Sequence, residues 1–154
     1  MRISKNIDRK ALKLGLEASS KDEALAELVS LLCGAYRLNG RDAILDAIRA
    51  REEKQSTGIG MGLAVPHAKT PAVDRLYIAF GRSVEGIEFD SIDGGRAHLF
   101  FMLVSPRDVS GPHIRALAGI SRLIKHEEFR KELLECSNAK RWIDIVKQAE
   151  ARYL

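Results

Sequence analysis

A histidine directly behind a proline is the side chain of this sequence that is best placed for chemistry. His67 ends the glycine-dense segment Ser56-Thr-Gly-Ile-Gly-Met-Gly-Leu-Ala-Val-Pro-His67. The unperturbed pKa of histidine lies near neutrality, so an imidazole can act as a base, a ligand or a nucleophile. Pro66 restricts the backbone before it, and glycines at alternating positions let a ligand or partner approach the backbone closely. Core packing requires neither feature, so the pattern predicts an imidazole held for chemistry.

A second histidine is predicted to lie where an anion binds well. His113 follows Pro112 in the first turn of an expected helix, where free backbone N–H groups and the helix dipole attract negative charge. Its ring N–H could also donate to a phosphate. Ser56 and Thr57, which begin the glycine segment, are further candidates for contacting a phosphate because each could offer a hydroxyl group. The other two histidines, His98 and His126, are interpreted as structural or exposed.

An arginine with the spacing of a buried stripe is the third candidate. Ile44, Ile48 and Arg51 are spaced by four and three residues and share one face of an expected helix. A buried arginine needs a partner because an unpaired buried charge is unfavourable. The fork of the guanidinium group suits a phosphate or a carboxylate. The partner could therefore be an anionic ligand, or a neighbouring acid such as Glu52 or Asp90.

Several familiar catalytic patterns are missing from the chain. The glycine segment is not followed by the Gly-Lys-Ser/Thr of a phosphate-binding loop, and it does not match the dinucleotide fingerprint. There is no Cys-x-x-Cys or His-x-x-x-His pair that would suggest a metal site, and no Gly-x-Ser-x-Gly nucleophile elbow. The sequence therefore predicts neither a cofactor nor a metal ion.

Composition points to one ordinary globular domain over residues 1–154. The net charge of +4 comes from 25 Lys and Arg mixed with 21 acids, which favours a solvated surface over a nucleic-acid stripe. The longest apolar run, Leu99 to Val104, is too short to cross a membrane, and the N-terminus lacks the apolar core of a leader. Cys33 and Cys136 fall on apolar stripes and are expected to be reduced, as in a cytoplasmic protein.

Local signals predict the order of the elements in the first two thirds of the chain. Ser20 and Glu23 form a capping-box pattern before a helix that Asn39-Gly40 should end. A second helix is expected from about Arg41 to Lys54. The predicted strands are Gly62 to Val65, Leu76 to Gly81 and Leu99 to Val104, with a possible short strand from Glu88 to Ser91. The third of these strands is apolar throughout and should be buried on both faces.

The last third is predicted to be helical. Ser110-Gly-Pro112 is a helix start signal. A further helix is expected over Glu127 to Cys136, and Asn138 should cap a last one that carries Trp142. Helices at both ends of a set of strands indicate an α/β domain built as a layered sandwich, with the sheet between helices.

Six segments together carry a resemblance to a known family. The chain resembles the enzyme IIA components of the phosphoenolpyruvate-dependent phosphotransferase system (PTS), in the type-2 group of the fructose, mannitol and nitrogen-regulatory branches. The resemblance covers roughly residues 4 to 150. It rests on Arg51-Glu52, Ser56-Thr-Gly-Ile-Gly-Met-Gly62, Ala64-Val-Pro-His67, Phe89-Asp-Ser-Ile-Asp-Gly94, Leu99-Phe-Phe-Met-Leu-Val-Ser-Pro106 and His113-Ile-Arg-Ala-Leu117.

This resemblance implies a mixed central sheet with helices on both sides, and a function. His67 would accept a phosphoryl group on Nε2 from the phosphocarrier protein HPr, or from its nitrogen-branch homologue. It would then pass the group to a sugar-specific IIB component or hold it as a regulatory signal. Arg51 and His113, with backbone N–H groups of the glycine segment, would stabilise the phosphoryl group during transfer. No cofactor, nucleic acid or insertion into a membrane is implied.

The sequence leaves two alternative functions open and departs from the family pattern at one notable position. The chain could act mainly as a nitrogen-regulatory module that binds partners according to its phosphorylation, or as a two-histidine phosphoester hydrolase with Arg51 as a clamp. Ala68 stands where many family members have glycine, which puts a Cβ beside the site. Because the face of HPr often carries positive charge, a locally neutral or apolar patch is expected around His67.

Overall fold

The computed structural model describes residues 1–154 as one six-stranded sheet between two layers of helices. Strands β5 and β6 pair antiparallel, whereas β1 pairs parallel with β5, and β3 and β4 pair parallel with β6. The order across the sheet is β1-β5-β6-β3-β2, with β4 beyond the end of β3 on the same edge of β6. The sheet is therefore mixed, as the resemblance implies. The strands are β1 (Leu12–Lys13), β2 (Gly58–Gly60), β3 (Leu63–Ala64), β4 (His67–Lys69), β5 (Tyr77–Ile87) and β6 (Ala97–Ser105).

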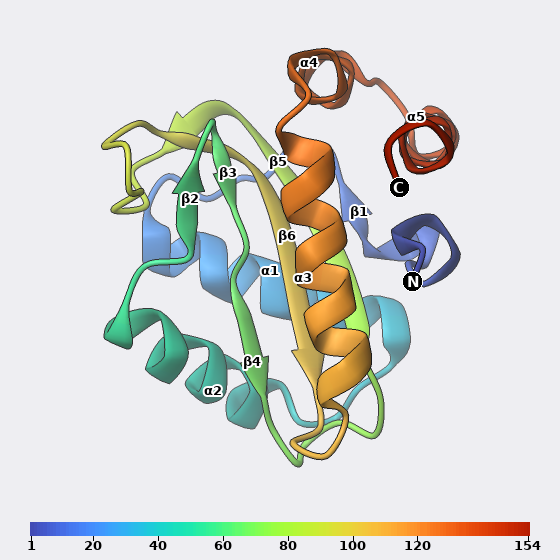
Figure 1. Ribbon diagram of the computed structural model, residues 1–154. Coiled ribbons are helices and arrows are strands. Elements are labelled where there is room, and N and C mark those ends of the chain that lie inside the picture. The colour runs from blue at the N-terminus through green and yellow to red at the C-terminus, as the bar shows by residue number, and fades with distance from the viewer.

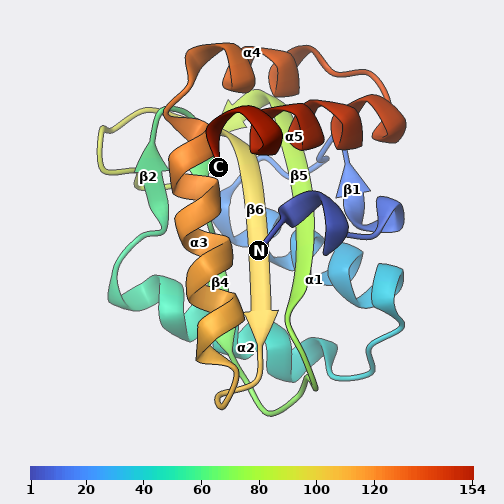
Figure 2. The ribbon, with the colours of Figure 1, turned by 45° about the vertical axis from the view of Figure 1, so that its right-hand side comes forward.

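Helices cover both faces of this sheet. The helices of residues 21–54 lie behind it in Figure 1, and the helices of residues 110–153 lie on the side that Figure 2 brings forward, together with the N-terminal turn. No helix is both long and apolar enough to span a membrane. The helices are α1 (Lys21–Tyr36), α2 (Arg41–Lys54), α3 (Ser110–Ile124), α4 (Glu127–Glu135) and α5 (Ala139–Tyr153), and two short 3-10 helices, η1 (Ile3–Lys5) and η2 (Arg9–Ala11), precede β1.

The predicted helix signals are largely confirmed. The Ser20 hydroxyl caps α1 by accepting the backbone N–H of Glu23 at 3.3 Å. Helix α2 has the predicted bounds, and Asn138 caps α5 by accepting the N–H of Arg141 at 2.8 Å. Helix α1 ends at Tyr36, before the predicted stop at Asn39-Gly40, because Arg37 already adopts a left-handed conformation with φ of 56°.

The glycine segment forms a hairpin, which corrects one prediction. Met61 and Gly62 both have positive φ, 57° and 76°, and join β2 to β3 as a two-residue loop. Two-residue hairpin loops with positive φ at both positions favour glycine, because glycine adopts positive φ without strain. A Cβ on Gly58 would lie only 2.9 Å from the Cα of Ser91. These glycines thus permit a tight turn and close packing of two segments, a role that the prediction of ligand access did not include.

Two strand predictions also change. Strand β5 is longer than the predicted Leu76 to Gly81, because it continues through a bulge to Ile87. Glu88 to Ser91 is not a strand but part of the connection to β6. Strand β3 lies within the predicted Gly62 to Val65. Strands β1, β2 and β4 were not predicted, because they are too short to give a period-two pattern in the sequence.

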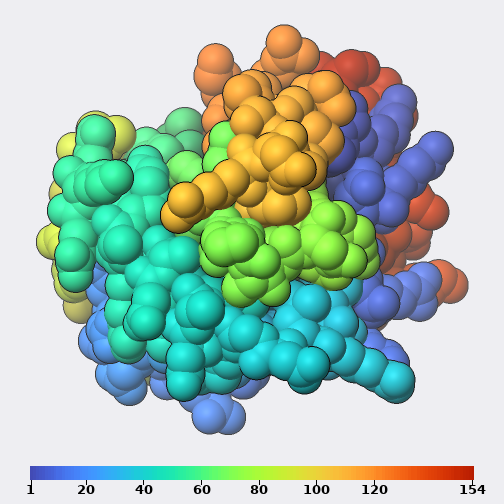
Figure 3. Space-filling view, turned by 90° about the horizontal axis from the view of Figure 1, so that it is seen from below, coloured from blue at the N-terminus to red at the C-terminus, as the bar shows by residue number.

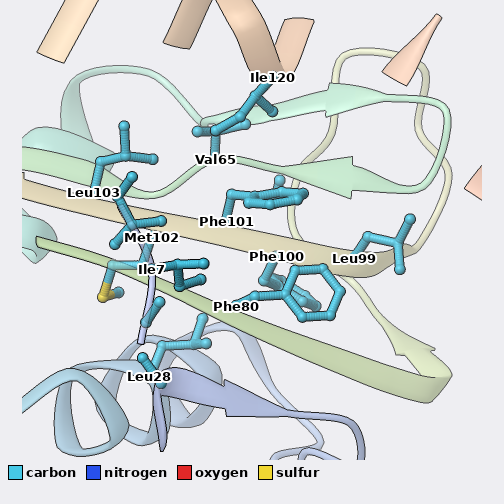
Figure 4. Close-up of a cluster of buried hydrophobic side chains, with 14 of the residues drawn as sticks. Ile7, Leu28, Val65, Phe80, Leu99, Phe100, Phe101, Met102, Leu103 and Ile120 are labelled. Carbon is cyan, nitrogen blue, oxygen red and sulfur yellow. The ribbon is translucent and has the colours of Figure 1, made fainter. Parts of the chain in front are cut away.

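The core lies on both faces of β6, as its apolar sequence predicts. Every residue from Leu99 to Ser105 is buried. In Figure 4, Leu28 of α1 and Ile120 of α3 lie on opposite sides of this strand. The Phe101 ring packs at 4.9 Å between centroids against Phe80. Cys33 and Cys136 are both buried and free. Strand β6 also positions β4, which pairs with it, and the start of α3, which follows it in the chain.

Candidate functional site

His67 begins β4 and is held in one orientation by its own backbone. It lies in register with Leu103 of the central strand β6. The Nδ1 atom lies 2.7 Å from the carbonyl oxygen of Val65. Because a carbonyl oxygen only accepts hydrogen bonds, Nδ1 carries the proton and the lone pair is left on Nε2. The Pro66 turn therefore fixes both the position of this imidazole and its tautomer.

His113 lies beside it, from the first turn of α3. Its side chain is only 3% exposed, and its Nδ1 lies 2.7 Å from the hydroxyl oxygen of Ser105 at the end of β6. The ring centroids of His67 and His113 are 5.4 Å apart, at an interplanar angle of 62°. The structure thus brings together the two histidines that the sequence singled out.

Arg51 reaches the same place from the last turns of α2, but without the acidic partner considered for it. It is half-buried, and its Nη1 donates to the carbonyl oxygen of Gln55 at 2.8 Å. The buried acid of this turn is Glu52, which accepts from Lys21 Nζ at 3.0 Å and from the backbone N–H of Thr57 at 2.9 Å. No acidic side chain pairs with Arg51.

These three side chains line one pocket of about 480 Å³, and the pocket is strongly cationic. Figure 3 views this end of the molecule, where α2, the connection after β4 and the start of α3 meet. The expectation of a neutral patch around His67 is wrong, because four cations and no acid line the pocket, whereas the apolar surface that was also expected is present. Its residues are Ala47, Ala50, Arg51, Lys54, His67, Ala68, Lys69, Arg107, His113 and Leu117.

Three of these cations were missed by the sequence reasoning, although two had a signal. Lys69 lies two residues after His67 in an extended segment, so both side chains fall on the same side of the strand. Lys54 lies three residues after Arg51 on a helix, so it shares that face. Lys69 is further placed by its Nζ, which donates to the Ser110 hydroxyl at 2.8 Å. Arg107 follows β6, and only the fold brings it to the pocket.

The structure does not bring Ser56 or Thr57 into this pocket. The Ser56 hydroxyl donates to the carbonyl oxygen of Phe89 at 2.7 Å, and the buried Thr57 hydroxyl donates to Glu52. Two backbone N–H groups of the glycine segment are also occupied, since Gly58 donates to Ser56 and Met61 donates to Asp93. The predicted phosphate contacts of this segment are therefore outside the assembled site. Its physical role is to shape the hairpin.

Ala68 stands where the resemblance leads one to expect glycine. It is buried in β4, in register with Val104, and it lines the pocket. Its methyl group therefore adds apolar surface to the site, as expected. The backbone of β4 accommodates this Cβ in a regular strand conformation.

Both imidazoles are held in the neutral form. Burial lowers the pKa of His67 below its usual value, and the charge of Arg51 lowers it further, while the Val65 carbonyl opposes the shift. Burial lowers the pKa of His113 to about 4, with added repulsion from His67 and Lys69. A neutral His67 has a free lone pair at neutral pH, which is what a nucleophile requires.

We expect His113 to titrate near pH 4 in an NMR titration of the folded protein. The unfolded chain binds a proton to this residue with an ordinary histidine pKa of about 6.5. The stability contributed by the neutral ring is thus complete above that value and is lost as the pH falls toward 4. Denaturant unfolding of the protein and of His113→Gln at pH 7 and pH 5 should show a smaller pH dependence in the variant. A His113 signal that titrates at pH 6.5 or above would contradict the buried neutral ring.

Comparison with known proteins is consistent with this geometry. Residues 5–149 match the family model described as phosphoenolpyruvate-dependent sugar phosphotransferase system, EIIA 2. A match over this length shows the family. The fold is that of a phosphotransferase-system component, and the chain belongs to the EIIA 2 family.

Relatives from two branches are similar to the chain. Over 148 residues it is 42% identical to the PTS system fructose-specific EIIABC component of Bacillus subtilis. This match covers 96% of this chain but only 23% of that protein. The crystal structure of nitrogen regulatory protein IIA-Ntr from Neisseria meningitidis is 28% identical, with a TM-score of 0.87, over 94% of this chain and 98% of that one. Enzyme IIA of the mannitol system of Escherichia coli, solved in complex with phosphorylated enzyme IIB, shares the fold at 19% identity and a TM-score of 0.78, over 92% and 97% of the two chains.

Proposed function

We propose that this protein is a cytoplasmic phosphocarrier that takes a phosphoryl group onto Nε2 of His67 from phosphorylated HPr or its nitrogen-branch homologue. It then passes the group to a IIB component. The observation that carries this proposal is the fixed tautomer of His67, whose Nδ1 donates to Val65 in a pocket lined by cations and no acid. Membership of the EIIA 2 family and the likeness to an enzyme IIA solved with phosphorylated enzyme IIB support it.

The chemical step is an in-line exchange of one N–P bond for another. The Nε2 lone pair of His67 forms a bond to phosphorus while the N–P bond of the donor's phosphohistidine breaks. The electron pair of the broken bond stays on the donor's ring nitrogen, so no oxidant or reductant is involved. Because the two bonds are alike, the transfer is readily reversible.

Arg51 supplies the main electrostatic stabilisation in this proposal. The transition state of phosphoryl transfer spreads negative charge over its equatorial oxygens, so catalysis is mostly positioning and electrostatics. Only one donor of Arg51 is occupied, by Gln55. Its remaining N–H groups are available to the oxygens, and Lys69 adds a second positive charge at the pocket wall.

His113 acts as a neutral donor. When the Ser105 hydroxyl donates to Nδ1 of His113, the ring proton is on Nε2. That N–H can then donate to a phosphoryl oxygen on His67. A positively charged ring is disfavoured here because burial lowers the pKa of His113 to about 4.

The experiment that tests this function locates the phosphoryl group. We expect the protein, incubated with phosphoenolpyruvate, the general first enzyme and HPr, to gain one acid-labile phosphate. Phosphorus and nitrogen NMR of the labelled protein should place it on Nε2 of His67. A phosphate on Nδ1, on His113 or on a hydroxyl group would contradict the mechanism.

A regulatory role is the second candidate, and the likeness to nitrogen regulatory protein IIA-Ntr favours it. In that case His67 would be phosphorylated in the same way, but the phosphoryl group would control binding to a partner protein. Incubation of the labelled protein with membranes that contain a sugar permease separates the two roles. Loss of the label supports transport, and retention of the label with partner binding supports regulation. Membership of a family of phosphotransferase-system components disfavours a phosphoester hydrolase.

A further inference from the structure

The pocket around His67 holds more positive charge than the group it is proposed to carry can neutralise. Arg51 is half-buried, whereas Lys54, Lys69 and Arg107 are exposed on the pocket wall. A phosphoryl group adds about two negative charges at most at neutral pH. Two positive charges would therefore remain even in the phosphorylated protein, and four are present before phosphorylation.

No acid of this chain lines the pocket, although the nearby charge of Glu52 acts to raise the pKa of His67. Glu52 is turned to Lys21 and Thr57, and the neighbouring Glu53 lines a separate groove on the other side of α2. Asp108 is exposed next to Arg107 but does not line the pocket. None of the four pocket cations forms an ion pair. The positive surface is consequently available to a partner.

Apolar surface lies between and beside these cations. Ala47, Ala50 and Leu117 line the pocket itself. Ile114 is 61% exposed, and helical spacing places it on the side of α3 next to Leu117. An apolar centre with a charged rim is typical of a protein docking surface. We call the surface formed by Lys54, Lys69, Arg107 and Ile114 the His67 rim.

We propose, on the basis of the function proposed above, that the protein which delivers the phosphoryl group to His67 carries an acidic surface around its own phosphohistidine. Complementary charge speeds the encounter of two proteins and rejects partners of like charge. A carrier with a basic face would meet four like charges at the His67 rim and the pocket, and would be repelled.

The positive charge of the pocket attracts the protein that delivers the phosphoryl group more strongly than the protein that later receives it. The donor meets the unphosphorylated protein, in which all four pocket cations are uncompensated. After transfer, the phosphoryl group on His67 offsets about half of that charge. Attraction to an acidic donor therefore weakens once it has delivered its group, which favours its release.

The test compares two phosphorylated carriers in rapid-mixing experiments with the intact protein. One probe is an HPr with acidic residues around its phosphohistidine, and the other is an HPr with basic residues there. We expect the second-order rate with the acidic carrier to be at least about tenfold higher at low salt, and to fall about tenfold between about 20 and 300 mM salt. The rate with the basic carrier should rise with salt over the same range.

Charge reversal on this chain provides the matched control. The double variant Lys54→Glu and Arg107→Glu should lose about tenfold in second-order rate with the acidic carrier, and its salt dependence should flatten. Transfer at saturating carrier should change less than the second-order rate. The control pair Lys140→Glu and Lys147→Glu makes the same change in net charge at exposed positions of α5, and it should leave the rate unchanged.

The outcomes separate this inference from the function on which it rests. If both carriers label His67 with the same salt dependence, or if the α5 control loses as much as the variant of the His67 rim, the acidic donor is wrong and the phosphocarrier function stands. If neither carrier labels the wild-type protein during long incubation, the phosphocarrier function itself fails, and the inference fails with it.

Discussion

His67→Ala is expected to gain no phosphate from phosphorylated HPr, which is the largest effect that any substitution in this chain should have. The variant lacks the only imidazole with a fixed free Nε2 in the cationic pocket. His113 cannot replace it, because that side chain is 3% exposed and its Nδ1 is engaged with Ser105. Radiolabel from phosphoenolpyruvate, followed by gel separation under alkaline conditions, measures the loss directly.

The chain contains a closely matched control in His98. This residue is also half-buried, and its Nδ1 lies 3.0 Å from the carbonyl oxygen of Ser83, the same arrangement as in His67. It lies near the start of β6, far along the strand from the residues that pair with β4, and it does not line the cationic pocket. His98→Ala should be labelled at the normal rate. Normal labelling of His67→Ala would instead show that the acceptor is elsewhere.

The contrast between these two histidines shows what sequence reasoning could achieve. Only His67 was singled out from the sequence, because Pro66 and the glycine segment precede it, whereas His98 was interpreted as structural or exposed. The structure places His67 in one pocket with His113 and Arg51. The order of the helices and the buried strand β6 was predictable as well, since caps and periodic apolar residues are local properties of the sequence.

What could not be predicted depends on contacts between distant segments. Ser56 and Thr57 looked available to a phosphate, but their partners, Phe89 and Glu52, are fixed only when the hairpin packs beside the end of α2. A glycine-rich hairpin and a glycine-rich ligand-binding loop have similar compositions, so composition alone could not distinguish a hairpin from a binding loop. Arg107 was missed for the same reason, since it joins the pocket from the end of β6, whereas Lys54 and Lys69 had local signals in the sequence that were overlooked. A net charge of +4 for the whole chain says nothing about where the charge gathers.

Arg51→Ala is expected to reduce the rate of phosphoryl transfer to His67 by about 10²–10³-fold, the cost of removing one aligned donor to transition-state charge in other enzymes. The half-buried guanidinium holds most of its donors free, because Gln55 occupies only one of them. Arg51→Lys keeps the charge but loses the planar fork, so its rate should lie between those of the wild type and the alanine variant. Single-turnover transfer at saturating carrier measures this step.

Arg49 supplies the comparison that separates transfer chemistry from general charge. It lies on the same helix, but its guanidinium is paired with Asp22 at 2.8 Å and lines the groove on the other side of α2. Arg49→Ala makes the same change in net charge and should leave transfer at saturating carrier unchanged. Losing the Gln55 hydrogen bond in Arg51→Ala should cost only about 1 kcal/mol of stability, so the variant should remain folded by circular dichroism. A loss in Arg51→Ala no larger than that in Arg49→Ala would mean that the cations of the pocket attract the partner but do not act on the phosphoryl group.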